Sequence, residues 1–390
     1  MIVKKWYATL ILSLFFLGCI PPHLQAAEDI APVYEEEQFI LSEIEEYVNQ
    51  VDQQIKEHIP ELSLKKIYED IKSGEFSWNI KDIILGLLGY LFKEVVANGE
   101  LMTQLLILAV ASAVLANLQG AFTQGNIAIL GHSVIYLVLI SIALNSFSLA
   151  VNAGKESIDA MTSFLYGIMP VLFSLLAAMG NMTSVLLIQP TMVMMLSFST
   201  FMIKTVVFPL IYFMAVLNIV SQISPHFKVT RLAGLFKDVS MGLFGIVMTV
   251  FVGFLGMQGL AGSVANGLTL KAAKFATGAF IPVVGRSLAD AMDTVIGTSL
   301  ILKNGIGIVG VIGIFLLCII PGIKIIAISL IYRVVAAVLQ PFGENQLSEA
   351  LHSLANSLLL IFAAVAAVGL MFFFVIAITI GTANISMMLR

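Results

Sequence analysis

Long apolar runs, separated by short polar stretches, fill this chain from residue 101 to its C-terminus. A helix needs about 20 apolar residues to cross the ~30 Å hydrocarbon core of a membrane, and several runs approach that length. The candidate spans are 101–119, 127–150, 161–180, 184–203, 205–222, 239–260, 306–330 and 354–380. Only Lys204 interrupts the stretch 183–221, so its two spans form either a tight hairpin or one broken, tilted element. The pattern predicts an all-α fold, a polytopic membrane helix bundle of about six to eight spans.

The first 26 residues have the pattern of a secretory signal peptide. Lys4 and Lys5 precede an apolar run at 10–17, and cleavage can follow Ala26 or Ala27. We therefore predict a cleaved signal peptide at 1–26.

Two other interpretations of this segment are less favourable. An uncleaved anchor needs roughly 20 apolar residues, and fewer precede the two prolines that end the run. A lipoprotein signal would use Cys19, but Phe16 replaces the leucine usual in that motif. After cleavage at Ala26 or Ala27, Cys318 is the one cysteine left, so no intrachain disulfide can form.

The rest of the chain divides into four segments by its polar pattern. We expect an exported acidic amphipathic-helical segment, a first group of transmembrane helices, a polar amphipathic or re-entrant module, and C-terminal transmembrane helices. Their bounds are 27–100, 101–260, 261–305 and 306–390. The helix expected near 80–95 lies either along the membrane surface or against the bundle, since both environments use the same broad apolar face.

Composition agrees with a membrane protein and makes the polar module stand out. Hydrophobic residues make up 59% of the chain and charged residues only 11%, with a mean hydropathy of +1.00, which is too apolar for a soluble domain. The module nevertheless concentrates six charged residues. They are Lys271, Lys274, Arg286, Asp290, Asp293 and Lys303.

Basic residues predict the orientation of the spans. With the mature N-terminus outside and eight crossings, the loop carrying Lys228, Arg231 and Lys237 falls inside, as the positive-inside rule requires. The polar module would then lie outside despite its basic residues. A re-entrant or interfacial module would remove that conflict.

The predicted spans offer few groups for chemistry. No Asp or Glu occurs between Met161 and Lys237, which argues against an ion-coupled pump. Lys204, Lys324 and Arg333 either extend to the interface or line a polar pathway. Gly245, Thr249 and Gly253, with glycines nearby, form a small-residue face, and self-association and packing within one chain explain it equally well.

Motifs for enzymatic chemistry are absent from the sequence. Residues 305–310 fit GxGxxG, but they continue directly into an apolar run with no preceding strand. The histidines are scattered singly, so we predict no metal, no cofactor and no enzyme. Arg286, Asp290 and Asp293 share one helix face by their spacing. They form either a solvated face or a contact or gating surface, and we add Lys274 and Lys303 to the candidate partner or pore surface.

The module and several other segments resemble the stage III sporulation protein AE family of endospore-forming bacteria. The main block reads KFATGAFIPVVGR at 274–286, DAMDTV at 290–295 and LILKN at 300–304. Shorter similar segments occur in the same order elsewhere. They are EVVANG at 94–99, ALNSF at 143–147, MTSF at 161–164, KVT at 228–230 and LQP at 339–341.

The resemblance implies a role in sporulation after engulfment. Members of the family belong to an assembly of mother-cell proteins that joins a forespore-made partner across the two membranes around the forespore. That assembly, described as a channel or feeding tube with secretion-like parts, is needed for late forespore gene expression. The family has no established catalytic residues. Its implied location is the mother-cell (outer forespore) membrane.

Two functions of different classes follow. The first is a scaffold or export-gate subunit that contacts other stage III complex proteins, membrane lipid and, through its partners, the forespore protein, without nucleic acid. The second is a permease for a small solute. The few carboxylates in the predicted spans and the lack of detectable repeats favour the scaffold.

Overall fold

The computed structural model describes the backbone of residues 49, 80–121, 126–179, 182–223, 229–280, 284–342 and 345–388. Side chains are described for most of these residues, but not for 258–304 or for shorter stretches near several helix ends. The predicted signal peptide at 1–26, and all of 27–100 before residue 80 except residue 49, lie outside the described residues.

Every regular element in the described part of the chain is a helix, which confirms the all-α prediction. The α-helices are α4 Ile80–Ala97, α5 Gly99–Ala121, α6 Asn126–Ala178, α7 Met182–Met202, α8 Phe208–Ile223, α9 Thr230–Phe280, α10 Val284–Leu339 and α11 Asn345–Met388. A π-helix, η1 Ile203–Val207, joins α7 to α8, and a 3₁₀ turn, η2 Gln340–Phe342, follows α10.

Among the described residues, five helical stretches are long and apolar enough to cross a membrane. They are Ser133–Ala178, Gln189–Gln222, Thr230–Met257, Gly305–Phe342 and Gln346–Gly381. A sixth results if α4 and α5, which meet at a 54° bend, are counted together as one span. The structure thus has five or six candidate spans, at or below the lower end of the predicted range.

The prediction of separate spans at 127–150 and 161–180 is wrong, because both lie in the single helix α6. The polar residues between them form no loop. This stretch contains no proline, and Gly154 is its one glycine, so nothing in its backbone chemistry ends the helix. The charged residues at 155, 156 and 159 lower the local hydropathy but do not end the helix.

The stretch 183–221 is one continuous helical element rather than a hairpin. α7 passes into η1 and then into α8 without a loop. Lys204 lies inside η1, where a π turn adds one residue to the helix and shifts the faces of the residues that follow.

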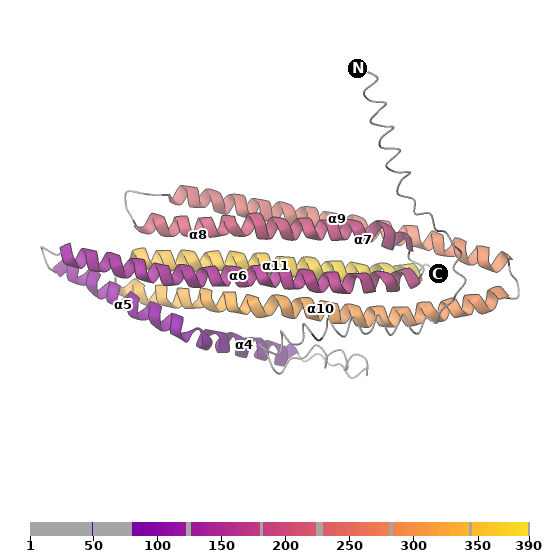
Figure 1. Cartoon of the computed structure of the whole chain (residues 1–390), viewed down its shortest axis with the longest axis horizontal. Helices are drawn as coiled ribbons and strands as arrows, with labels where there is room; N and C mark the ends of the chain where they lie inside the picture. Colours follow the sequence, from indigo (N-terminus) through magenta and orange to yellow (C-terminus); the bar gives the residue numbers. More distant parts are fainter. Residues whose placement is uncertain are drawn as a thin grey trace, which may run out of the picture. The chain divides into compact units, whose positions relative to one another are not determined.

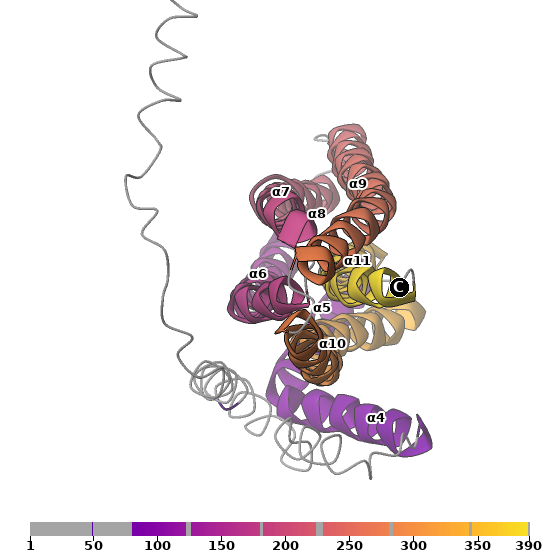
Figure 2. The ribbon, with the colours of Figure 1, turned by 90° about the vertical axis from the view of Figure 1, so that its right-hand side faces the viewer.

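The long helices lie beside one another in alternating directions (Figure 1). Viewed from the end, α6, α10 and α11 form the centre, with α7, α8 and α9 on one side and α4 on the other (Figure 2). Contacts between helices agree with this arrangement, since α10 packs on α11 and α6, and α8 packs on α9 and α11.

Glycines allow the central helices to approach closely. A Cβ atom at Gly313 of α10 would overlap the ring of Phe164 on α6. At Gly154 of α6, an added Cβ would lie 3.2 Å from Ile361 of α11. Such contacts are typical of membrane helices, where small residues bring backbones together.

Hydrogen bonds between helices add to this packing. The Tyr332 hydroxyl on α10 donates to the Ala143 carbonyl on α6 at 2.7 Å, and it lies 2.7 Å from the Ser146 hydroxyl. Ser157 of α6 donates to the Leu317 carbonyl of α10 at 2.8 Å. All of these side chains are buried, so the α6–α10 interface is fixed by specific partners.

The small-residue face predicted on α9 takes no part in this packing. A Cβ atom added at Gly242, Gly245, Gly253 or Gly256 would meet nothing within 4 Å. The sequence therefore pointed to glycines that the chain leaves open, while the tightly packed ones lie on α6, α10 and α11.

Candidate functional site

The predicted module residues lie on two helices. Lys274 is in α9 and Arg286, Asp290, Asp293 and Lys303 are in α10. Their backbones are helical, which agrees with a shared face for Arg286, Asp290 and Asp293. Their side chains fall outside the described residues, so the proposed surface stays a prediction.

The GxGxxG sequence at 305–310 lies inside helix α10. Two of its glycines face α11, since an added Cβ at Gly307 would overlap Ile380 and one at Gly310 would lie 3.2 Å from Ile376. These glycines therefore serve helix packing, and their match to the nucleotide-binding motif is a coincidence.

Polar side chains gather in the middle of α6, where the sequence predicted a connection between spans. Asn152, Lys155, Glu156 and Asp159 all occur within two turns of the helix. Because α6 is continuous, these residues lie within the candidate span Ser133–Ala178. The sequence pattern does not reveal them as a site, because a local drop in hydropathy is the same for a loop and for a polar turn of a continuous helix.

Asp159 of α6 forms an ion pair with Lys204 of η1. The carboxylate is 61% exposed and the lysine 28%, so the pair lies at the surface of the bundle. The π turn places Lys204 opposite α6, and π turns are frequent at functional sites. The sequence left open whether Lys204 extends to the interface or lines a pathway, and its ion pair with Asp159 is compatible with both.

The other two basic residues expected near spans are exposed on α10. Arg333 donates to Asn356 Oδ1 of α11 at 3.0 Å. Lys324 faces away from the core. Neither lines the cleft described below.

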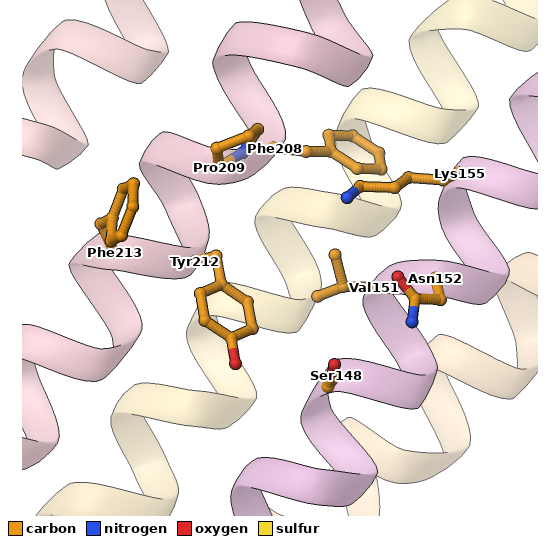
Figure 3. A pocket seen from close by; sticks show the side chains of 8 residues that line it. All are labelled: Ser148, Val151, Asn152, Lys155, Phe208, Pro209, Tyr212 and Phe213. Atoms are coloured by element: carbon orange, nitrogen blue, oxygen red, sulfur yellow. The ribbon is translucent and has the colours of Figure 1, made fainter.

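A cleft of about 230 Å³ lies beside the ion pair, between α6 and α8. Helix α6 contributes Ser148, Val151, Asn152 and Lys155. Helix α8 contributes Phe208, Pro209, Tyr212 and Phe213. In Figure 3, Lys155 extends from α6 towards Phe208, and Tyr212 faces Val151 and Ser148 from α8.

Two contacts between α6 and α8 bound this cleft. The rings of Phe147 and Tyr212 are 5.6 Å apart between centroids. A Cβ added at Gly154 would lie 3.4 Å from the Phe208 ring. Phe147 and Phe208 are both fully buried, so aromatic rings pack beneath the cleft, and the polar groups lie on its α6 wall.

We call Asn152, Lys155, Glu156 and Asp159 of α6, together with Lys204 of η1, the polar layer. Its positive and negative charges do not balance on the side that faces the cleft. Lys155 and Asp159 are four residues apart and share one helix face, and Lys204 lies across from them. Asp159 is ion-paired with Lys204, which leaves Lys155 as the uncompensated cation on that face. Glu156 is turned by about 100° from Lys155 around α6 and does not line the cleft.

Nothing in the described residues forms a metal centre. No group of three or more His, Cys, Asp or Glu side chains able to hold a metal ion occurs there. The arrangement offers a cation, an amide and two hydroxyls beside aromatic rings, which suits binding of a polar or anionic group.

The comparisons with known proteins agree with the sequence resemblance. The family described as Stage III sporulation protein AE matches residues 62–383. Over 332 residues, covering 85% of this chain and 83% of the relative, the chain is 39% identical to Stage III sporulation protein AE of Bacillus subtilis (strain 168). No solved structure matches the chain. The resemblance drawn from the block at 274–286 and its companion segments is confirmed.

Proposed function

Because the chain belongs to the stage III sporulation protein AE family, we propose that it is a multi-pass component of the sporulation channel complex that links mother cell and forespore. It acts there as a scaffold or export-gate subunit in the mother-cell membrane. Its partners are the other mother-cell stage III proteins and, through them, the forespore-made protein.

Helix length is the observation that carries this proposal. α6 has 53 residues and α10 has 56, which at 1.5 Å per residue gives lengths of roughly 80 Å. The hydrocarbon core of one membrane is only ~30 Å thick. More than half of each helix is therefore available for contacts beyond that core, as an assembly subunit requires.

The centre of the bundle also suits a fixed support. Glycine contacts and buried hydrogen bonds join α6, α10 and α11 at several levels. A transporter that alternates between two openings must let such interfaces slide or rock. Moving α6 past α10 would break the Ser157 and Tyr332 hydrogen bonds together.

The first test uses the charged module in sporulating cells. We expect Asp290→Lys to prevent copurification of the chain with its complex and to abolish late forespore gene expression, while the variant still reaches the membrane at normal abundance. Lys324→Glu, a charge reversal on the exposed side of the same helix, is the matched control and should assemble normally. Normal assembly of the Asp290→Lys protein would refute a contact at this surface.

An exchange of charges separates a partner contact from a salt-bridge row within α10. The double variant Arg286→Asp with Asp290→Arg keeps an opposite-charge pair at the same spacing. A partner surface predicts that the exchange fails to restore assembly. If the double variant assembles normally, the charged residues of this row serve only to stabilise α10.

The polar layer of α6 favours the second candidate, a permease for a small solute. Glu156 and Asp159 lie inside a candidate span, so the sequence argument that spans lack carboxylates does not hold for α6. A permease predicts that Asp159→Asn abolishes forespore gene expression while complex assembly stays intact. A scaffold predicts that both readouts remain near normal in this variant.

A further inference from the structure

The cleft between α6 and α8 has a lining of two chemical kinds. Lys155, Asn152, Ser148 and Tyr212 offer hydrogen-bond donors, and Pro209 and Phe213 offer apolar surface above the buried Val151 and Phe208. No hydrogen bond or ion pair joins these four polar side chains to other described residues. The volume of about 230 Å³ is below the ~300–1,000 Å³ of sites for drug-sized ligands, so a small head group fits better than a large solute.

The charge of the cleft selects an anion. The ion pair with Lys204 occupies Asp159, which leaves the ammonium group of Lys155 as the free charge on that wall. A lysine, an amide and hydroxyls together match the acceptor oxygens of a phosphate group, because hydrogen bonds to an ionised oxygen are about twice as strong as neutral ones.

The position of the cleft relative to the membrane follows from the distribution of charged residues along the helices. Beyond the polar layer, about 20 residues without charge occur side by side on three elements, enough for one ~30 Å hydrocarbon core. They are 160–178 of α6, 182–203 of α7 and η1, and 304–323 of α10. Contacts of Phe164 with Gly313, and of Tyr166 with Ser197, place these stretches at one level.

On the other side of the layer, 126–154 of α6 and 208–223 of α8 are also free of charge, but the helices packed on them carry charged residues. The residues are Arg231, Lys237 and Asp238 of α9, Lys324 and Arg333 of α10 and Glu349 of α11. The polar layer with Lys155, Asp159 and Lys204 therefore marks the border of the charge-free belt, where lipid head groups lie and lysines extend to the interface.

We propose that this cleft binds a phosphate ester at the membrane surface, with the phosphate held by the Lys155 ammonium group at one end of the cleft and the Ser148 and Tyr212 hydroxyls available to the rest of the head group at the other. The apolar part of the ligand lies along Pro209 and Phe213 on the α8 wall. This site is separate from the module at 261–305 and does not depend on the proposed complex. The phosphate belongs either to an anionic phospholipid or to a soluble phosphate ester, and the experiment distinguishes the two sources.

The test uses the purified full-length chain in detergent after reconstitution with phosphatidylglycerol and phosphatidylcholine. Native mass spectrometry measures which lipid stays bound as detergent is exchanged. We expect phosphatidylglycerol to be retained by the unchanged protein and by Lys324→Gln, and roughly tenfold more weakly by Lys155→Gln, since the loss is that of a charge-assisted hydrogen bond. Tyr212→Phe, which removes one hydroxyl, should weaken retention less.

A second arm measures thermal unfolding in lipid-free neutral detergent with inorganic phosphate. Stabilisation by phosphate that depends on Lys155, without lipid retention, would support a soluble ester as the ligand. Equal lipid retention by Lys155→Gln and Lys324→Gln, together with no Lys155-dependent effect of phosphate, would overturn the proposal. Unchanged elution volume and melting temperature of Lys155→Gln without ligand confirm that this variant folds.

Discussion

At the scale of single residues, one hydrogen bond explains how α10 accommodates a proline. Pro321 lies inside α10 and has no N–H, so the carbonyl four residues earlier, at Leu317, lacks its helical donor. Ser157 of α6 supplies that donor at 2.8 Å in a buried position. The hydrogen bond that compensates Pro321 of α10 thereby fixes the position of Ser157, and so of α6, along α10.

Ser157→Ala is expected to lower the free energy of unfolding by about 1–2 kcal/mol, because the Leu317 carbonyl is left buried without a donor. Thermal unfolding in detergent measures the change. Ser357→Ala is the matched control, since that buried hydroxyl bonds a carbonyl of its own helix that keeps its backbone donor. Adding Pro321→Ala to Ser157→Ala restores the missing N–H, so a double variant no more stable than Ser157→Ala would contradict this account.

Glycine contacts make a second prediction at this scale. Gly313→Ala would place a methyl group against the Phe164 ring, and overpacking of this kind costs about 1–3 kcal/mol. Gly242→Ala on α9 meets open space and should leave stability unchanged or raise it, because alanine favours the helix. Similar melting temperatures for the two variants would contradict the α6–α10 packing.

At the scale of elements, the sequence predicted helices well and their ends poorly. Residues 127–150 and 161–180 were each recognised as helical by their apolar length. The join between them depends on Gly154 and Ser157 packing against α11 and α10, which are contacts with segments far away in sequence. A local hydropathy drop cannot show whether such partners exist.

The cleft was unpredictable for the same reason. Its α6 wall has Asn152 and Lys155 at helical spacing, a signal that was present in the sequence once the helix was known to continue. Its α8 wall depends on η1, because the added residue of a π turn changes which side chains face α6. No sequence pattern indicated that turn.

The ion pair between Asp159 of α6 and Lys204 of η1 predicts a variant that binds phosphatidylglycerol more strongly, opposite to the effect of Lys155→Gln. Asp159→Asn removes the carboxylate that neutralises Lys204, so the cleft gains positive charge and should retain phosphatidylglycerol more strongly. Stability should change by less than about 1 kcal/mol because the pair is exposed. Glu156→Gln changes the same net charge away from the cleft, and an equal gain in both variants would assign the effect to general attraction rather than to the site.

At the scale of the whole molecule, the charge-free belt places the rest of the bundle relative to the membrane. The belt ends on α10 at Lys303, and 20 more helical residues extend from there back to Val284, a length of roughly 30 Å. The described backbone of α9 and α10 is helical throughout this part. We therefore expect the module that carries Arg286, Asp290 and Asp293 to be a helical extension in water that contacts a partner.

Single cysteines in a Cys318→Ser background test this placement in intact cells and in inverted vesicles, with a membrane-impermeant thiol reagent. Glu156→Cys lies in the polar layer and Ser287→Cys lies in the module, so both should react, each from the opposite side of the membrane. Ser174→Cys is on an exposed face of α6 but within the belt, where lipid should protect it. Labelling of Ser174→Cys together with protection of Ser287→Cys would move the belt to the module and make residues 261–305 a membrane-embedded element, which would favour the pore-lining role over the docking role.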